Sequence, residues 1–478
     1  MRGRAALSAQ CTGGSNPNAR AAPHPTPFQG ATFSREGRRG ALIGLLSPWR
    51  SRFMRDGGRI AAAIQVLEDI GERHKPVRMA LKTWGEASRY AGAKDRAWVS
   101  GLVLDALRRR RSLGWMIGAE DARAVVLATL AFAWDWPVER IAGAVDDAPH
   151  GPGALAEAEL AALASPRPLA DAPAPVRGDY PDWLDQRLAR QYGDERARET
   201  AGLAARAPVD LRVNSLKTDV ARALKALSPL GAARVGVLAD ALRVPAPDAA
   251  ERAAAVETAP EFQKGWFEVQ DLGSQIAAAA AGEIKGRQVL DFCAGGGGKT
   301  LALAAAMGNS GQLYAYDADA RRLSETVKRA TRAGVRNLQV RSPLRPDALD
   351  DLQGRMDLVF VDAPCTGSGT WRRHPDAKWR LTEAQLERRM AEQEAVLGAA
   401  AAYVKPGGRL VYVTCSLLAE ENEDRVAAFL AAHRAFANAA IEIAGTEPWR
   451  TGAGHLRLTP RNANTDGFFV AALTRSAA

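Results

Sequence analysis

Apolar and polar positions follow a helical period between about residues 57 and 165. The stretches RIAAAIQVLEDIGER, DRAWVSGLVLDALRRRRSL and ARAVVLATLAFAWDW carry apolar residues three or four positions apart, the spacing that places side chains on one face of a helix. In the first stretch these positions are Ile60, Ile64, Val66, Leu67 and Ile70. The pattern predicts an all-helical domain over residues 57–165.

The period changes beyond residue 283, where short β-rich runs alternate with helical stretches. The β-rich runs lie in RQVLDF, QLYAYD, NLQVRS, MDLVFVD, GRLVYVTCS and GFFVAAL. Such alternation is typical of an α/β domain with a parallel, doubly wound sheet, here predicted for residues 283–478. Ligands of these sheets bind beyond the carboxyl ends of the strands.

Two further segments separate and precede these domains. Residues 166–181 are rich in Pro and Ala and are predicted to form a linker, and residues 182–282 read as a small α/β region. Residues 1–56 contain eight arginines within their first 53 positions, one acid there and no apolar period, which predicts disorder. This leader is either an organelle transit peptide or translated sequence upstream of a true start at Met54.

Composition narrows the function classes. A chain of 478 residues exceeds one ordinary core, and it contains no apolar run of the roughly 18 to 20 residues that a membrane helix requires. Lys and Arg exceed Asp and Glu by 64 to 54, for a net charge of +10. This excess favours a polyanionic partner, although a solvated basic surface would also explain it. Four cysteines without zinc spacing indicate a reducing, cytoplasmic compartment and no metal site.

A glycine-rich loop, LDFCAGGGGKT, follows a predicted strand and opens a helix. It is not a P-loop, because the first P-loop glycine would fall at Cys293. The next strand ends at Asp317, where an acid can bind ribose hydroxyls. Loop and acid together suit NAD or S-adenosylmethionine; the alternative is a tight packing turn.

Two cysteines follow the ends of predicted strands, Cys365 in DAPC and Cys415 in VTCS. Both should therefore lie at the same edge of the sheet as the glycine loop, although free cysteines are often buried and inert. Methylation of a pyrimidine at C5 needs such a set, because a thiolate must add at C6 before C5 can attack a sulfonium methyl group. Asp362 is placed to hydrogen-bond the N3 edge of the base, or else it caps the turn that follows.

Cations and indoles crowd the segment after Cys365, which reads TGSGTWRRHPDAKW. Arg, Lys and His can bind phosphates, and Trp can stack on unpaired bases. The alternative is that Trp371 and Trp379 are ordinary packing residues.

Together these motifs resemble the Sun (Fmu) type of RNA cytosine-5 methyltransferases, which includes the Nop and Nol nucleolar proteins. DFCAGGGGKT is similar to the family's cofactor loop, DAPC with RRHPDAKW to its motif four, TCS with EENE to its motif six, and TDGFF to its closing strand. FEVQDLGSQ and LRVNSLK resemble segments ahead of the catalytic domain, so the resemblance covers roughly residues 180–478. The helical block looks like the NusB-like RNA-binding domain of the bacterial ribosomal members.

The resemblance implies a Rossmann-like class I methyltransferase domain with S-adenosylmethionine as cofactor. Cys415 would be the nucleophile and Cys365 would assist release, with Asp362 and Lys299 beside the base. The implied cofactor residues are Cys293, Ala294, Gly295, Gly296, Gly297, Gly298, Lys299, Asp317, Ser342, Pro343 and Asp362. The implied RNA-binding residues are Arg212, Asn214, Arg372, Arg373, His374 and Lys378.

Two positions depart from the family pattern. Ser342 and Pro343 stand where relatives carry an acid for the adenine, and Gly295-Gly296 stands where many carry Ala-Pro. The expected partner is RNA, namely 16S ribosomal RNA, bound by a monomer in the cytoplasm. We expect residues 57–165 to contribute RNA affinity and not chemistry.

Two other functions fit part of the pattern. A DNA cytosine-5 methyltransferase would attack with the cysteine of Pro364-Cys365. A non-catalytic ribosome assembly factor would keep the scaffold and bind RNA only. The second cysteine and the helical domain argue against the first, and retention of both cysteines argues against the second.

Overall fold

The computed structural model describes residues 54–248 and 255–477. Almost all of the predicted leader, residues 1–56, therefore lies outside the described residues. Within the described ranges, no helix is both long and apolar enough to span a bilayer.

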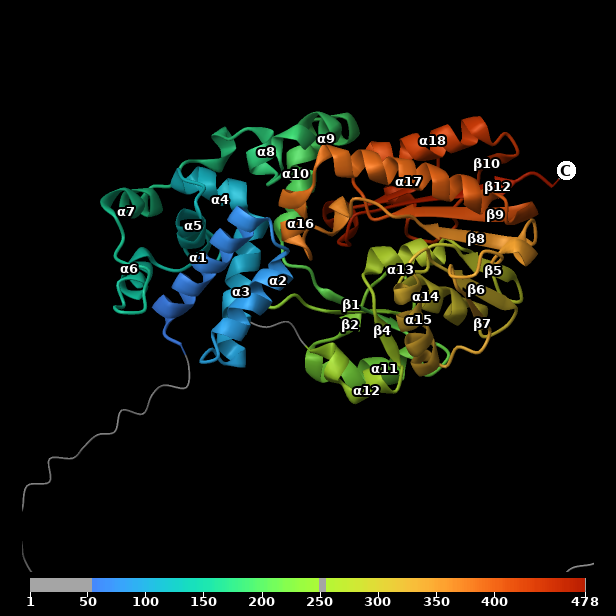
Figure 1. The fold of residues 1–478 in the computed structure, drawn as a ribbon, viewed down its shortest axis with the longest axis horizontal. Coiled ribbons are helices and arrows are strands. Elements are labelled where there is room, and N and C mark those ends of the chain that lie inside the picture. Colours follow the sequence, from blue (N-terminus) through green and yellow to red (C-terminus); the bar gives the residue numbers. More distant parts are fainter. Residues whose placement is uncertain (1–53, 249–254, 478) are drawn as a thin grey trace, which may run out of the picture. The chain divides into compact units, whose positions relative to one another are not determined.

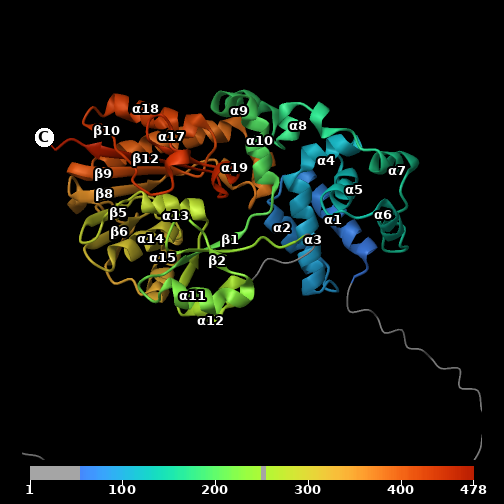
Figure 2. The same ribbon diagram turned by 180° about the vertical axis from the view of Figure 1, so that it is seen from behind.

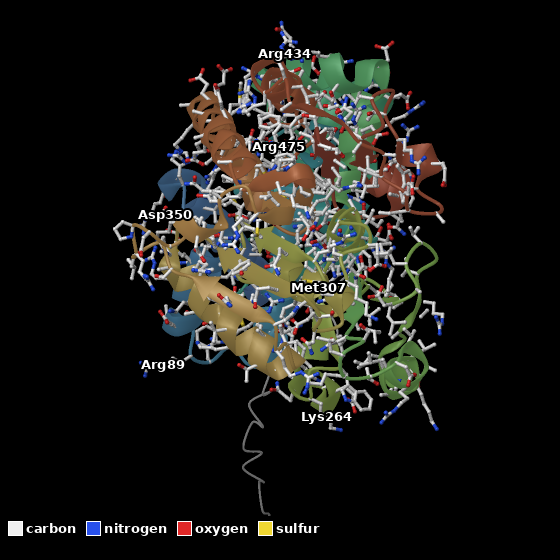
Figure 3. The ribbon with its side chains drawn as sticks, turned by 90° about the vertical axis from the view of Figure 1, so that its right-hand side faces the viewer. Arg89, Lys264, Met307, Asp350, Arg434 and Arg475 are labelled. Carbon is white, nitrogen blue, oxygen red and sulfur yellow. The ribbon has the colours of Figure 1, made fainter. Side chains whose placement is uncertain are left out.

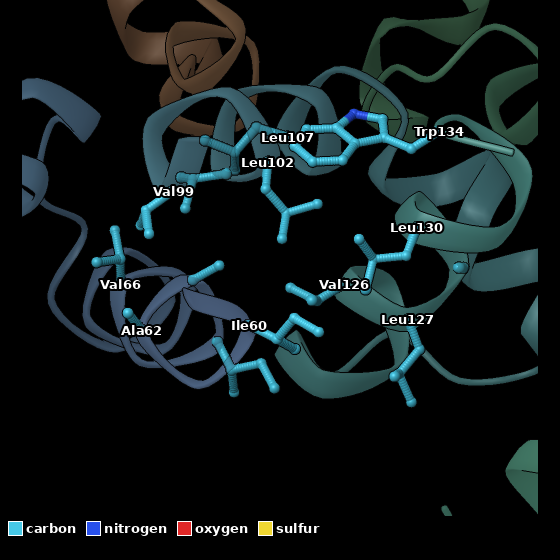
Figure 4. Close-up of a cluster of buried hydrophobic side chains, with 14 of the residues drawn as sticks. Ile60, Ala62, Val66, Val99, Leu102, Leu107, Val126, Leu127, Leu130 and Trp134 are labelled. Atoms are coloured by element: carbon cyan, nitrogen blue, oxygen red, sulfur yellow. The ribbon is translucent and has the colours of Figure 1, made fainter. Parts of the chain in front are cut away.

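The N-terminal region is helical, as its apolar period predicts (Figure 1). Its helices are α1 (Asp56–Arg73), α2 (Val77–Ala87), α3 (Ala93–Arg108), α4 (Arg110–Ile117), α5 (Ala122–Phe132), α6 (Val138–Val145) and α7 (Glu157–Ala164). Figure 4 shows the core between α1, α3 and α5, where Ile60, Leu102, Val126 and Leu130 are almost inaccessible to solvent. Burial of these apolar faces holds the bundle together.

The predicted linker is folded against the bundle rather than extended. It contains a short turn (Leu169–Asp171) and α8 (Ala174–Arg177), and it leads into α9 (Asp185–Tyr192) and α10 (Arg196–Ala201). Asp179 at its end is buried and accepts hydrogen bonds from the backbone amides of Arg111 and Ser112 in α4. These bonds satisfy amide groups of the first turn of that helix, which have no partner within it.

A small antiparallel sheet follows, with strand order β2-β3-β1-β4. Its strands are β1 (Val209–Val213), β2 (Ala233–Arg234), β3 (Ala241–Val244) and β4 (Phe267–Val269), accompanied by α11 (Val220–Leu227) and α12 (Pro260–Gln263). Leu211, Val213, Leu242 and Phe267 form its core.

The C-terminal region contains the predicted doubly wound sheet, with order β10-β12-β9-β8-β5-β6-β7 and β11 paired beside β12. The strands are β5 (Gln288–Asp291), β6 (Gln312–Tyr316), β7 (Leu338–Arg341), β8 (Met356–Asp362), β9 (Val404–Thr414), β10 (Phe436–Asn438), β11 (Leu456–Leu458) and β12 (Phe468–Arg475). Strands β5 to β9 are parallel, so their carboxyl ends share one edge.

The prediction of a wholly parallel sheet is wrong for the last strand, because β12 runs antiparallel to β9 and to β10. GFFVAAL is apolar because both faces of β12 are covered. A strand covered on both faces has the same composition in either direction, so the pattern cannot report its polarity.

Helices cover both faces of this sheet (Figures 1 and 2). On one face lie α13 (Leu272–Ala279) and α14 (Gly298–Met307), and on the other α17 (Glu383–Ala401) and α18 (Glu423–Ala432). Three further helices are α15 (Ala320–Ala333), α16 (Pro375–Arg380) and α19 (Pro460–Ala463). The chain reverses its winding direction between β5 and β8, which is where doubly wound sheets bind ligands.

Candidate active site

Two thiols meet at the carboxyl ends of neighbouring parallel strands. Cys365 lies three residues beyond the end of β8 at Asp362, and Cys415 directly follows the end of β9 at Thr414. Their Sγ atoms are 3.4 Å apart, and both residues are partly buried. The prediction that both cysteines lie at one edge of the sheet is therefore confirmed.

The pKa of the Cys365 thiol lies well above its ordinary value. The main causes are its hydrogen bond with the Cys415 sulfur and burial, which disfavours the charged thiolate. At neutral pH Cys365 therefore keeps its proton.

An ion pair between the buried Lys299 and the partly exposed Asp362 stands beside the thiols. Lys299, in the first turn of α14, donates from Nζ to Oδ2 of Asp362 at 2.7 Å. Burial alone would lower the pKa of Lys299, but attraction to Asp362 outweighs it, and a charge on Cys415 adds to the rise. Lys299 therefore remains an ammonium group within electrostatic reach of the Cys415 sulfur.

Glu421 joins the two cysteine-bearing loops. Its carboxylate accepts hydrogen bonds from the Thr366 amide at 2.8 Å, from the Thr366 hydroxyl at 2.6 Å and from the Ser416 hydroxyl. Thr366 follows Cys365, and Ser416 follows Cys415. Glu421 is fully buried, and Gln393 of α17 donates to it at 2.9 Å. Glu421 belongs to the EENE motif, but the sequence predicted no role for it. The positions of residues along the chain do not show which buried groups a carboxylate will contact.

The glycine loop is held from its far side by α15 and by the end of β6. Gly295 adopts φ +53° and its amide donates to Oδ2 of Asp317 at 2.8 Å, and its carbonyl accepts from the Thr326 hydroxyl at 3.0 Å. The Arg329 guanidinium donates to the Gly296 carbonyl at 2.6 Å. A Cβ at Gly297, where φ is +84°, would approach Thr326 to 2.9 Å. Side-chain contacts thus supply the rigidity that a proline would otherwise give this loop.

The predicted cofactor residues lie at the carboxyl ends of β5, β6 and β7. Cys293 and Ala294 follow β5, Asp317 follows β6, and Ser342 and Pro343 follow β7. Burial raises the pKa of Cys293 well above its ordinary value, so this thiol is neutral. A carboxylate, a glycine-rich loop backbone and a helix N-terminus at one edge suit a cofactor with ribose hydroxyls and polar ends. The described residues include no cluster of three or more metal-ligating side chains.

Two predicted RNA contacts in the segment after Cys365 are contradicted by burial. Lys378 is 1% exposed, its Nζ donates to the Arg108 carbonyl at 3.0 Å, and burial lowers its pKa to about 8. Arg372 is 2% exposed and pairs with Asp466 and with Asp271, the latter at 3.1 Å. Lys378 therefore hydrogen-bonds a buried carbonyl and Arg372 pairs with buried carboxylates, so neither cation can reach a phosphate.

The predicted RNA contacts of β1 are likewise wrong. Arg212 is buried and donates to the Gln270 side chain at 2.8 Å. Asn214 is buried and donates to the carbonyls of Gly265 and Ala333, each at 2.8 Å. Asn214 thereby connects the small sheet to the end of α15.

Of the six residues predicted to bind RNA, His374 alone is exposed, and Arg373 is partly buried between Asp466 and Asp271. Trp371 is 1% exposed, and the Trp379 indole donates to the Leu107 carbonyl at 2.7 Å. The interpretation of both tryptophans as packing residues is therefore confirmed.

The segment after Cys365 is fixed by the helical region. Arg108, at the end of α3, donates from Nε to the Arg372 carbonyl at 2.9 Å. The Val77 amide at the start of α2 donates to Oδ2 of Asp376 at 3.2 Å. The helical region therefore positions the loop that carries Cys365, in addition to any contact with RNA.

Sequence comparisons show which known proteins this chain resembles. The sequence model described as 16S rRNA methyltransferase RsmB/F matches residues 281–474, and a model of a ferredoxin-like domain of RsmF/B-like methyltransferases matches residues 180–250. Ribosomal RNA small subunit methyltransferase B of Erwinia tasmaniensis is 30% identical over 441 residues, which cover 86% of this chain and 97% of that protein.

Solved structures share the fold. The crystal structure of PH0851 has a TM-score of 0.66 and 25% identity, covering 88% of this chain and 99% of that one. The structure of NSun6 from Pyrococcus horikoshii with SFG has a TM-score of 0.53 and 23% identity, covering 62% of this chain and 98% of that one.

Proposed function

This chain belongs to the RsmB/F family of 16S rRNA methyltransferases, and from that premise we propose that it methylates C5 of a cytosine in 16S ribosomal RNA with S-adenosylmethionine as donor. The observation that carries the proposal is the pair of thiols 3.4 Å apart beside the Lys299–Asp362 ion pair. A single attacking thiol would suffice for addition to the ring. A second thiol in contact with it suits the separate step that releases the product.

In the proposed mechanism Cys415 forms a bond from Sγ to C6 of the cytosine, which makes C5 nucleophilic. As the Cys415 sulfur attacks, its proton would pass to the Asp362 carboxylate, which Lys299 holds in place, and from there to N3. The proton on N3 offsets the negative charge that the addition places on the ring. S-adenosylmethionine, when bound, supplies the methyl group that C5 receives. Cys365, as a neutral thiol, assists release by hydrogen-bonding the departing Cys415 sulfur. The C5 proton passes to water, and the electron pair of that C–H bond restores the ring double bond as the Cys415–C6 bond breaks and the N3 proton returns through Asp362 to the Cys415 sulfur.

The cofactor would lie along the edge formed by the glycine loop, Asp317 and Ser342. Support comes from the backbone of the loop, which turns at glycines with positive φ and leads into α14. NSun6, which has a similar fold, was solved with SFG in its structure. Asp317 would accept from ribose hydroxyls, since its carboxylate retains acceptor capacity beyond its two bonds to the amides of Gly295 and Asp319.

The experiment that tests the proposal compares Cys415→Ala with Cys365→Ala. Each variant is incubated with labelled 16S RNA and S-adenosylmethionine and run on a denaturing gel. Cys415→Ala should give no methylation and no covalent adduct, because the ring is never activated. Cys365→Ala should transfer the methyl group but stall at release, leaving RNA bound through Cys415.

The reverse result would point to a DNA-type mechanism, in which the cysteine of Pro364-Cys365 attacks. That alternative has one observation in its favour, the Pro-Cys dipeptide itself. A trapped adduct in Cys415→Ala and none in Cys365→Ala would make Cys365 the nucleophile. Lys285→Ala is the control, since Lys285 is exposed, precedes β5 at the opposite edge of the sheet and should not alter adduct formation.

A further inference from the structure

One face of the helical region is basic and carries an exposed aromatic ring. In residues 77–96 the exposed charged side chains are the cations Arg78, Lys82, Arg89, Lys94 and Arg96 and one acid, Glu86. The remaining acid of this stretch, Asp95, is buried and pairs with Arg59 at 2.7 Å. The surface over α2 and the turn into α3 is therefore predominantly positive.

We define the α2 face as four residues of this surface: Arg78, Lys82, Arg89 and Tyr90. Arg78 and Lys82 are four residues apart and so share one side of the helix. Arg78 and Arg89 form no ion pair with any side chain in the described part of the chain. Tyr90 is 72% exposed in the turn after α2 and contacts no other aromatic ring among the described residues. An exposed tyrosine between cations is suited to stack on an unpaired base.

The α2 face is connected to the thiols by a short series of contacts. The Gly369 amide donates to the Cys415 carbonyl at 2.9 Å, and the His374 amide donates to the Thr370 carbonyl at 3.0 Å. His374 is exposed and lies within the electrostatic reach of Arg78. α2 itself begins at the hydrogen bond from Val77 to Asp376 of α16, beside which Figure 1 draws it.

The opposite side of α2 is unsuited to a polyanion. A cavity of about 390 Å³ lies between α1 and α2 and is lined by Glu68, Asp69 and Glu72 as well as Arg73 and Lys75. A second cavity of about 310 Å³ lies away from α2, beside α1, and is lined by Glu68, Glu72, Glu120 and Asp121 as well as Arg110. These acids would repel phosphates, so an RNA strand that reaches α2 is restricted to its outer face.

We propose that the α2 face binds the RNA segment that flanks the target cytosine, with Arg78 and Arg89 on phosphates and Tyr90 on an unpaired base. The proposal rests on the proposed function, because it assumes that RNA is the substrate. It places the RNA path on α2 instead of on the buried cations that follow Cys365.

The test measures binding of full-length protein to in vitro transcribed 16S RNA from 50 to 200 mM KCl. In the Arg78→Ala/Arg89→Ala variant, two lost phosphate contacts should reduce the slope of log affinity against log salt by about 1.4 to 1.8. Affinity at the lowest salt should fall about tenfold. Tyr90→Ala should weaken binding at least about fivefold, whereas Tyr90→Phe, which keeps the ring, should bind as the wild type does.

The matched control is Lys285→Ala/Arg434→Ala. Both residues are exposed, and they precede β5 and β10, so they lie at the amino-terminal edge of the sheet, away from the thiols. Figure 3 labels Arg434 and Arg89 at opposite ends of the molecule. The control should retain the wild-type affinity and slope.

The outcomes separate this proposal from the one on which it rests. A wild-type slope in the Arg78→Ala/Arg89→Ala variant, or an equal loss in the control pair, would overturn the role of the α2 face. Methyl transfer by the same variants at saturating RNA would show that the proposed function still stands. Failure of the wild-type protein to bind 16S RNA or to methylate it would reject the proposed function itself.

Discussion

Buried carboxylates organise the site at the scale of single residues. Glu421 connects the loops of the two cysteines, and Asp362 keeps Lys299 charged beside them. Asp291, at the end of β5, is fully buried with one oxygen bonded to Thr300 at 2.6 Å. Glu421 and Asp291 act through the groups they hold, so each should have an effect that differs from that of a reacting thiol.

We predict that Glu421→Gln lowers the rate of methyl transfer about tenfold to a hundredfold while affinity for S-adenosylmethionine is retained. The amide would present NH2 to one of the donors from Thr366, Ser416 or Gln393, so one loop must move. Single-turnover kinetics and calorimetry measure the two quantities. Glu420→Gln is the control, because Glu420 pairs with Arg187 at 3.1 Å, outside the thiol loops; an equal loss in both variants would contradict the prediction.

A second residue-scale prediction concerns pH. Burial raises the pKa of Asp291 to about 7, with the Thr300 hydrogen bond opposing the shift and Asp362 adding to it. The folded protein therefore keeps this proton up to about pH 7, whereas the unfolded chain loses it near pH 4, so the stability that the proton contributes is present at low pH and is lost as pH rises to 7.

Asn in place of Asp291 does not titrate. Between pH 5 and pH 7 the free energy of unfolding of Asp291→Asn should therefore rise relative to wild type by roughly 2 to 3 kcal/mol, with little further change above pH 8. Chemical denaturation of both proteins across this range measures the difference. Parallel stability curves would show that Asp291 is ionised in the folded state.

At the scale of elements, the glycine loop depends on the two segments behind it. The end of β6 binds the loop through Asp317, and α15 binds it through Thr326 and Arg329. Arg329 also pairs with Glu268 of β4 at 2.9 Å, so the small sheet supports the loop as well.

We predict that Asp317→Ala weakens binding of S-adenosylmethionine at least about tenfold, on the order of 1.4 kcal/mol. The substitution removes both the proposed ribose acceptor and the partner of the Gly295 amide. Asp319→Ala is the control, because Asp319 caps α15 through the Arg321 amide and its loss should weaken that helix cap without affecting the cofactor. Calorimetric titration with unchanged affinity for Asp317→Ala would count against the cofactor site.

Strand ends could be predicted from the sequence, and burial of charge could not. Apolar runs that stop at Asp362 and at Thr414 define where β8 and β9 end, so the meeting of the two cysteines followed from the shared edge of a parallel sheet. The cations after Cys365 were misassigned because a charged side chain usually lies at the surface. Their partners, Asp466, Asp271 and the Arg108 carbonyl, come from distant parts of the chain that no local pattern connects to them.

At the scale of the whole molecule, the helical region and the catalytic sheet share one interface. Arg108 is its central residue: it is 8% exposed, pairs with Asp105 at 2.6 Å, donates to the Arg372 carbonyl and accepts from Lys378. The helical region therefore supports the chemistry, beyond the RNA affinity expected of it.

We predict that Arg108→Met lowers the free energy of unfolding by about 2 kcal/mol, since a buried charged hydrogen bond is lost while Asp105 keeps Arg206. The rate of methyl transfer should fall by a larger factor than the affinity for S-adenosylmethionine, because the loop that carries Cys365 becomes less rigid. Arg109→Ala, which changes the next side chain along, should leave the free energy of unfolding and the rate of methyl transfer nearly unchanged. Denaturant titration and single-turnover assays distinguish these outcomes, and equal effects of the two variants would contradict the role of Arg108.

The same interface determines when during synthesis the site can form. Its hydrogen bonds join residues 264 to 299 positions apart. The helical region leaves the ribosome first and can fold from local contacts, but the end of α3 then has no partner until the segment after Cys365 has been translated. For most of translation the nascent chain therefore exposes this docking surface to solvent and to chaperones. A truncated translation product would carry a folded helical region and no chemistry, and if RNA follows the proposed path over α2 it would compete with the complete enzyme for RNA.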